Sequence, residues 1–129
     1  MNNLDIVILG SPGERREELT NTIKAIGHTP VPTDSEFAGT GDAILVDLDT
    51  ALTESELQNA ELDARPMLVV AGAVSPALRR LMARSADTLL VTDPSEGGLR
   101  TALATASGLA ARRQPAPGRA MAWMAAAAS

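Results

Sequence analysis

Residues 41–49 read Gly41-Asp42-Ala43-Ile44-Leu45-Val46-Asp47-Leu48-Asp49 and place an uninterrupted apolar run directly before an aspartate. A short run of this kind, without polar alternation, is typical of a strand buried on both faces of a parallel sheet. Asp47 would then project from the carboxyl edge of that sheet, where open α/β folds place their functional sites. The stretch therefore predicts both an α/β fold and a candidate site at Asp47.

Apolar runs of similar length recur along the chain and predict the remaining strands. Residues 4–9, 67–71 and 88–92 are rich in Val, Ile and Leu, with as little polar alternation as residues 43–48. Residues 29–33 form a weaker run that contains Pro30 and Pro32. Because proline has no amide hydrogen to donate to a strand ladder, this run fits only an edge strand.

Helical patterns separate the predicted strands, and three of them begin with a start signal. A capping side chain is followed by proline in Ser11-Pro12-Gly13-Glu14, Ser75-Pro76 and Asp93-Pro94-Ser95-Glu96. Gly27 is the expected C-cap of the first helix, and residues 53–63 predict a less amphipathic, acidic helix. The residues expected to face inward are Leu19, Ile23 and Ile26, then Leu78, Leu81 and Met82, and finally Leu99, Leu103 and Ala106.

The alternation of strands and helices predicts a parallel sheet with helices on both faces. Right-handed crossovers leave few arrangements for five such strands. We expect a flavodoxin-like, doubly wound five-stranded sheet in the order 2-1-3-4-5. The α/β domain is expected to cover residues 1–113, followed at residues 114–129 by a Pro/Ala-rich linker or tail.

The composition argues against several classes of function. The chain has 129 residues, enough for one domain with its own core, and 45% of them are apolar. It has no cysteine, which excludes disulfides, thiolate metal sites and cysteine nucleophiles. Its single histidine argues against a zinc site. Aromatic residues make up 2% and the net charge is -5, so we expect no nucleic-acid partner. Without a signal peptide or a membrane-spanning run in this sequence, we expect a cytoplasmic protein, with no membrane insertion and no cofactor.

Several stretches resemble the CheY-like receiver family of response regulators. The similarity to a receiver's first strand and helix lies in DIVILGSPGERREELTNTIKAIGH at residues 5–28, and that to its third strand in GDAILVDLD at residues 41–49. The similarity to the fourth and fifth strands lies in PMLVVAGA at residues 66–73 and SADTLLVTDP at residues 85–94. This resemblance implies that Asp47 occupies the phospho-acceptor position.

Four positions depart from the receiver pattern. Receivers bind magnesium through two acidic residues at the end of the first strand, where this chain has Leu9 and Gly10. The hydroxyl residue that ends the fourth strand is replaced by Ala71, and the lysine that ends the fifth by Thr92. Because phosphoryl transfer depends on positioning and on charge neutralisation, these losses argue against Mg²⁺-dependent phosphorylation. We therefore interpret Asp47 as a vestigial phospho-acceptor position.

Two further features have both a functional and a plain structural interpretation. Asp42, Asp47 and Asp49 together could attract a divalent ion, or could simply lie in a solvated loop. The turn from Gly10 to Gly13 could cradle an anion at a helix N-terminus, although it lacks the spacing of known phosphate loops. A turn followed by a helix cap explains it equally well.

Residues away from the carboxyl edge of the predicted sheet give weaker indications of function. His28 is expected at the surface, at the start of the edge strand. Arg79, Arg80 and Arg84 form a basic strip on the helix after Ser75, which we treat as a candidate partner contact. The pair Gly97-Gly98 weakens the first turn of the last helix, and indicates either close packing or fraying there.

The leading hypothesis is a non-catalytic pseudo-receiver that acts through protein–protein contacts in signalling, localisation or assembly, with no metal and an unidentified protein partner. Two alternatives stay open: an atypical receiver phosphorylated at Asp47 in a two-component pathway, and a flavodoxin-like domain that binds a small ligand or nucleotide. A homodimer is also left open.

The last residues carry a second, shorter resemblance. Pro117-Gly118-Arg119-Ala120-Met121-Ala122 is similar to the segment that follows receiver-like domains in CpaE/TadZ-type pilus-assembly and septum-site proteins. In those proteins a Gly-rich ATPase loop comes next, whereas this chain has alanines at residues 125–128. We therefore expect no ATPase in this sequence.

Overall fold

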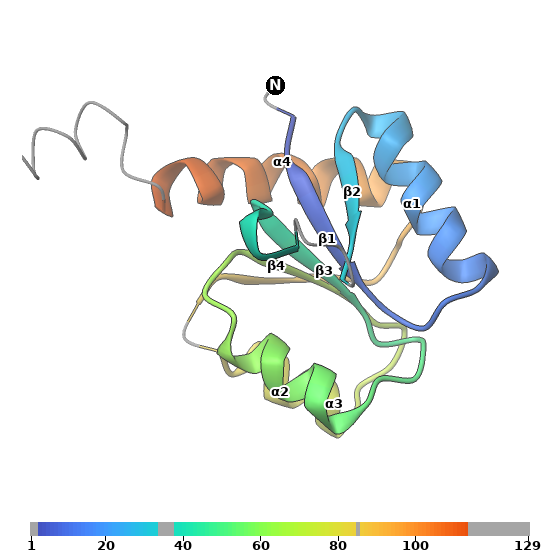
Figure 1. The fold of residues 1–129 in the computed structure, drawn as a ribbon, viewed down its shortest axis with the longest axis vertical. Coiled ribbons are helices and arrows are strands. Elements are labelled where there is room, and N and C mark those ends of the chain that lie inside the picture. The colour runs from blue at the N-terminus through green and yellow to red at the C-terminus, as the bar shows by residue number, and fades with distance from the viewer. Residues whose placement is uncertain (1–2, 34–37, 85, 114–129) are drawn as a thin grey trace, which may run out of the picture.

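A computed structural model describes residues 3–33, 38–84 and 86–113, and it contains one five-stranded parallel sheet in the order β2-β1-β3-β4-β5 (Figure 1). The predicted fold class and strand order are confirmed. The elements are β1 (Asp5–Leu9), α1 (Glu14–Ile26), β2 (Thr29–Pro32), η1 (Ala38–Thr40), β3 (Ala43–Asp47), α2 (Glu54–Leu62), β4 (Met67–Val70), α3 (Pro76–Met82), β5 (Thr88–Val91) and α4 (Glu96–Arg113).

The helices cover the two faces of the sheet in pairs, with α1 and α4 on one face and α2 and α3 on the other (Figure 1). The strands β3 and β4 are buried along their whole length, as their uninterrupted apolar sequences predict. Each face has its own core. One core packs side chains such as Ile6 and Ile23 beneath α1 and α4, and the other packs Val46 and Leu81 beneath α2 and α3.

The inward faces of the helices follow the predicted spacing except at one position. Leu19, Ile23 and Ile26 of α1 and Leu99, Leu103 and Ala106 of α4 are buried. In α3, Leu78 and Leu81 are buried, but Met82 is 41% exposed, so its predicted inward position is wrong. Met82 is the last residue of a seven-residue helix. In so short a helix, the buried stripe ends at Leu81.

At several helix ends, residues close together in the sequence are sufficient to set the boundary of the helix. Ser75 caps α3 as predicted, since its side chain accepts a hydrogen bond from the Leu78 amide and Pro76 occupies the first turn. In α2, Thr53 and Glu56 form a reciprocal capping box that the sequence contains but that we did not predict. Gly27 ends α1 with a φ of 108°, in agreement with the predicted C-cap.

The predicted N-termini of α1 and α4 are wrong. In α1 the expected capping side chain bonds elsewhere, and α4 begins at a later residue. Ser11 does not cap α1, because its hydroxyl donates to the Ala51 carbonyl, and the helix begins at Glu14 after Gly13. The last helix begins at Glu96, two residues later than the Asp93 signal implies. Asp93 accepts from the Ser95 amide, and the Ser95 hydroxyl lies 3.4 Å from the Gly98 amide.

Among the described residues, no helix has the length and apolarity needed to cross a membrane. The predicted linker and tail, and the CpaE/TadZ-like segment within them, lie outside the described residues.

Candidate functional site at the carboxyl edge of the sheet

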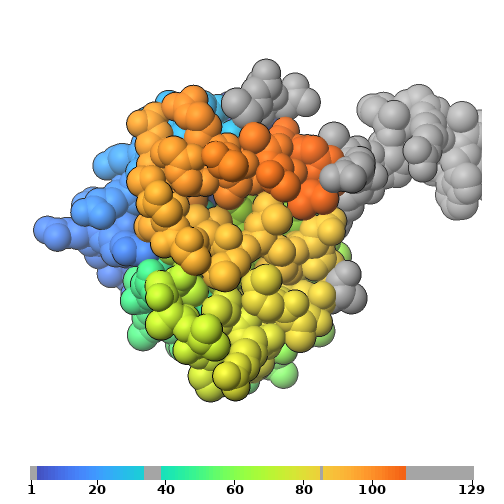
Figure 2. All heavy atoms as spheres, turned by 180° about the vertical axis from the view of Figure 1, so that it is seen from behind, coloured from blue at the N-terminus to red at the C-terminus, as the bar shows by residue number. Residues whose placement is uncertain are grey.

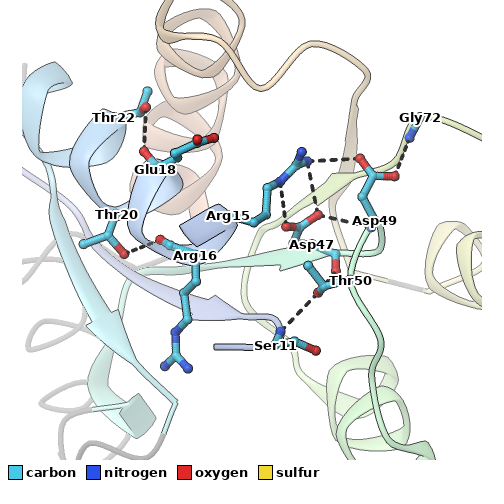
Figure 3. Close-up of polar contacts among 10 residues, drawn as sticks. All are labelled: Ser11, Arg15, Arg16, Glu18, Thr20, Thr22, Asp47, Asp49, Thr50 and Gly72. Atoms are coloured by element: carbon cyan, nitrogen blue, oxygen red, sulfur yellow. Dashed lines mark hydrogen bonds and ion pairs between the residues drawn. The ribbon is translucent and has the colours of Figure 1, made fainter. Parts of the chain in front are cut away.

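Asp47 ends β3 at the centre of the carboxyl edge, and only 1% of the residue is exposed. The following turn folds back on it, because the Thr50 hydroxyl donates to the Asp47 carbonyl at 2.8 Å. The Ser11 amide, from the turn after β1, donates to the same Thr50 hydroxyl at 3.1 Å (Figure 3). The turns that follow β1 and β3 are thus joined beside the buried carboxylate.

Gly10 has a packing role at this junction. A Cβ atom at Gly10 would lie 3.3 Å from the Cβ of Asp47 and 3.3 Å from the Thr50 hydroxyl, closer than most such contacts in proteins. Any larger side chain would therefore press on the turn that holds Asp47.

Arg15, in the first turn of α1, binds both aspartates of the site (Figure 3). Its Nε lies 3.0 Å from Oδ2 of Asp47, and its Nη2 lies 3.4 Å from Oδ1 of Asp47 and 3.0 Å from Oδ2 of Asp49. The planar guanidinium presents several donors in a fixed geometry, which suits two neighbouring carboxylates. Sequence analysis missed Arg15, because no motif connects it to residues 32 and 34 positions later.

Asp49 completes the arrangement and links it to the next strand. Its amide donates to Oδ1 of Asp47 at 3.1 Å, and its own Oδ1 accepts from the Gly72 amide at 2.9 Å. Every carboxylate oxygen of Asp47 and Asp49 therefore has a donor from within the protein. Asp42 does not join them: it lies at the opposite end of β3, where it accepts from the Asp5 amide.

The residues at this edge do not fit a magnesium ion. Mg²⁺ requires oxygen ligands in near-octahedral geometry. Leu9 and Gly10 provide no side-chain oxygen, and the guanidinium of Arg15 occupies the carboxylates that remain. Within the described ranges, no three acidic, His or Cys residues are grouped so as to hold a metal. At the same edge of the sheet, Ala71 follows β4 and the exposed Thr92 follows β5.

Known structures share this architecture at low sequence identity. No protein-family model matches the chain, and no curated protein does. The signal receiver domain of a LuxO repressor protein from Vibrio parahaemolyticus is 14% identical with a TM-score of 0.62, covering 87% of this chain and 95% of that one. The chemotaxis response regulator CheY4 of Vibrio cholerae is 13% identical with a TM-score of 0.60, covering 81% and 99%. The chain has the fold of CheY-like receiver domains.

This receiver fold is also shared with HP1043, an orphan response regulator of H. pylori, at 12% identity and a TM-score of 0.54, over 80% of this chain and 95% of that one. Identities this low establish the common fold and nothing about shared chemistry.

His28 is buried, with 4% of the residue exposed, so its predicted surface position is wrong. Its Nδ1 accepts a hydrogen bond from the Leu4 amide at 3.0 Å, which places the ring proton of the neutral form on Nε2. Within the described part of the chain, Nε2 has no hydrogen-bond partner. Burial lowers the pKa of His28 below its ordinary value of 6.5.

The three arginines of the basic strip have different surroundings. Arg80 forms ion pairs with Glu54 and Glu61 and so ties α3 to α2. Arg84 lies beyond the end of α3 at Met82, so its predicted place on that helix is wrong; it is partly buried and donates to the carbonyls of Asp63 and Arg65. Arg79 is exposed on α3, and no ion pair is found for it among the described residues. A partner contact through this strip stays a prediction, and Arg79 is the member most available for it.

Proposed function

We propose that this chain is a pseudo-receiver, a non-catalytic regulatory domain that works through protein contacts and is not switched by Mg²⁺-dependent phosphorylation of an aspartate. The observation that carries the proposal is the Arg15 guanidinium, which binds Asp47 and Asp49 together. A cation that belongs to the protein itself stands where a receiver would need room for a metal and a phosphoryl group.

Phosphorylation would require several changes at this edge at once. An attacking carboxylate oxygen must be accessible, whereas Asp47 is buried and both of its oxygens accept hydrogen bonds. The phosphoryl group must then find cations that neutralise its equatorial oxygens. Leu9, Gly10 and Thr92 supply no charge, and Arg15 is already engaged. The fold of a regulatory domain is retained here without the parts that phosphorylation uses.

The proposal is tested by titrating the ¹⁵N-labelled chain with Mg²⁺ and then with beryllofluoride, a phosphoryl mimic, while following amide shifts. We expect no saturable shift at Asp47, Asp49 or Ala71 in either step. Saturable shifts at these amides in the presence of both reagents would overturn the proposal and favour the atypical receiver phosphorylated at Asp47.

We expect no amide shifts for two reasons: the Arg15 guanidinium occupies the carboxylates, and Leu9 and Gly10 provide no metal ligands. An Arg15→Ala variant separates these two reasons. If shifts appear only in the variant, the guanidinium alone blocks the site. If the variant is also silent, the missing ligands at Leu9 and Gly10 are sufficient. Either result in the variant, combined with a silent parent chain, supports the pseudo-receiver.

A further inference from the structure

The two edges of the sheet differ in whether they can accept another strand. In a parallel strand, alternate residues direct both backbone groups to the same side. The Thr29 amide donates to the Leu4 carbonyl, so Thr29 and Val31 face β1 and the intervening residues of β2 face outward. Those outward residues are Pro30 and Pro32, which have no amide hydrogen. Proline thus closes the β2 edge to a partner strand.

The β5 edge has the opposite character. The Met67 amide donates to the Asp87 carbonyl and the Ala71 amide to the Val91 carbonyl, so the odd-numbered residues of this segment face β4. Thr88 and Leu90 therefore direct their amides and carbonyls outward. The strand reads Thr-Leu-Leu-Val, without a charge or a proline, and Leu90 is 46% exposed. At four residues β5 is short, but it contains neither the charged side chain nor the proline that commonly protect an edge strand.

A groove runs alongside this open edge, between β5 and α4. Its volume is about 360 Å³, and its walls include Leu90 on the strand and Gly98, Thr101, Ala102 and Thr105 on the helix. These small helical residues leave room beside the strand. Figure 2 shows the same face, where β5 reaches the surface between α4 and α3. A strand added here would place alternate side chains over α4 and beside Leu90.

The charges around the β5 edge favour a segment with a basic residue over a second copy of this chain. Asp87 and Asp93 are exposed at the two ends of β5, and neither forms an ion pair among the described residues. In an antiparallel pair of two copies centred on Leu90, Asp87 of each copy would lie opposite Asp93 of the other, which is unfavourable. Arg84 donates to the Asp87 carbonyl, so its positive charge partly offsets the negative charge at the Asp87 end of β5. The preference for a basic residue is therefore strongest beside Asp93.

We infer that the β5 edge is a binding site for an extended segment of a partner protein, with alternating β-branched residues and a basic residue that meets Asp93. The segment adds as a sixth strand, through backbone hydrogen bonds to Thr88 and Leu90 and side chains in the groove against α4. This inference names the kind of partner for the proposed protein-contact function. It is tested at Leu90 rather than at Asp47, so the two proposals can fail separately.

The test uses the full chain and a fluorescently labelled synthetic peptide with alternating Val and Thr and a Lys at each end. We expect saturable binding by fluorescence anisotropy that weakens as salt increases. Leu90→Pro removes an outward amide without touching the β4 ladder and should weaken binding at least about five-fold. The matched control Leu90→Thr keeps that amide and should bind nearly as well, while Asp93→Asn should weaken binding and reduce its dependence on salt.

A second measurement does not depend on how the variants fold. Peptides N-methylated on one or the other set of alternate amides should differ, because only one set can pair with β5. Equal binding of both methylated peptides, or no saturable binding of the parent peptide, would overturn the inference. A concentration-dependent dimer that Leu90→Pro abolishes, or protection of the Leu90 amide from hydrogen exchange in the chain alone, would assign the edge to a second copy or to this chain itself and would also overturn it.

Discussion

At the scale of single residues, the edge site is organised around one buried charge and its partner. Asp47 is almost fully buried, whereas the Arg15 side chain is 36% exposed. A buried carboxylate that loses its cation is costly, because its desolvation is no longer offset. The partial exposure of Arg15 moderates that cost, since water can approach the site from the Arg15 side.

We expect Arg15→Met to lower the free energy of unfolding by about 1–3 kcal/mol, because the buried carboxylate of Asp47 then loses its charged donor. Asp47→Asn should also destabilise, and the double variant should lose less than the sum of the two single changes. Urea denaturation followed by circular dichroism measures all four chains. Strictly additive losses would mean that the pair contributes nothing as a unit.

His28 predicts a pH dependence of stability. Because burial lowers its pKa, the folded state favours the neutral ring, and protonation at Nδ1 would break the bond from the Leu4 amide. The stability that this preference confers is complete above the unfolded pKa of 6.5 and is lost as pH falls from there through the lower folded pKa.

The matched variant is His28→Asn, whose side-chain oxygen can accept from Leu4 but does not titrate in this range. Between about pH 7.5 and about pH 5.5, the free energy of unfolding should fall more steeply for the parent chain than for the variant, by up to about 1.4 kcal/mol per pH unit. Parallel curves in urea denaturation at the two pH values would refute this role of His28.

At the scale of elements, the first turn of α4 contains two glycines with different surroundings. A Cβ atom at Gly98 would lie 2.0 Å from the Asp93 carbonyl oxygen, whereas one at Gly97 would meet nothing within 4 Å. Of the two interpretations of Gly97-Gly98, close packing therefore holds at Gly98.

Substitution by alanine should accordingly have opposite effects at the two positions. Gly97→Ala should stabilise the chain by about 0.5–1 kcal/mol through helix propensity. Gly98→Ala should destabilise it by about 1–3 kcal/mol, because the turn from Asp93 must move. Thermal melts of the two variants provide the comparison, and equal shifts in the same direction would contradict it.

The junction of α3 with the sheet is held by Arg84, whose guanidinium bonds carbonyls from the segment before β4 and the Thr88 hydroxyl of β5. We expect Arg84→Met to destabilise by about 2–3 kcal/mol, since it leaves these partly buried carbonyls without their donor. Arg79→Met, at an exposed position within α3, should change stability by less than about 0.5 kcal/mol. A loss of similar size in both variants by urea denaturation would argue against this assignment.

At the scale of the whole molecule, the stability of a protein rises with any ligand that binds only its folded state. Because the site residues do not fit Mg²⁺, addition of millimolar Mg²⁺ should leave the Tm of this chain unchanged to within about 1 °C, beyond the effect of matched ionic strength. Calorimetry with Mg²⁺ and with an ionic-strength control makes the comparison. A larger, saturable rise in Tm would reveal a cation site in the folded chain.

The amino-acid sequence by itself determined the architecture. Strands such as Ala43–Asp47 and Met67–Val70 are apolar at every position but the last of β3, and helices such as α1 carry an apolar stripe at helical spacing. Such continuous apolar runs and helical stripes are local patterns, and they indicate which element forms and which of its faces is buried. Ser75-Pro76 specified its helix start for the same reason, because a cap is a hydrogen bond between near neighbours.

Only the tertiary structure decided how the site is built. The pairing of Arg15 with Asp47, the burial of His28 and the diversion of Ser11 to Ala51 all join segments more than 20 residues apart in the chain. Polar side chains take whichever partner the folded chain brings within about 3 Å, and no local periodicity encodes that choice. The sequence thus specified the sheet and the position of Asp47, and packing of the turn after β1 against the end of β3 placed a cation on it.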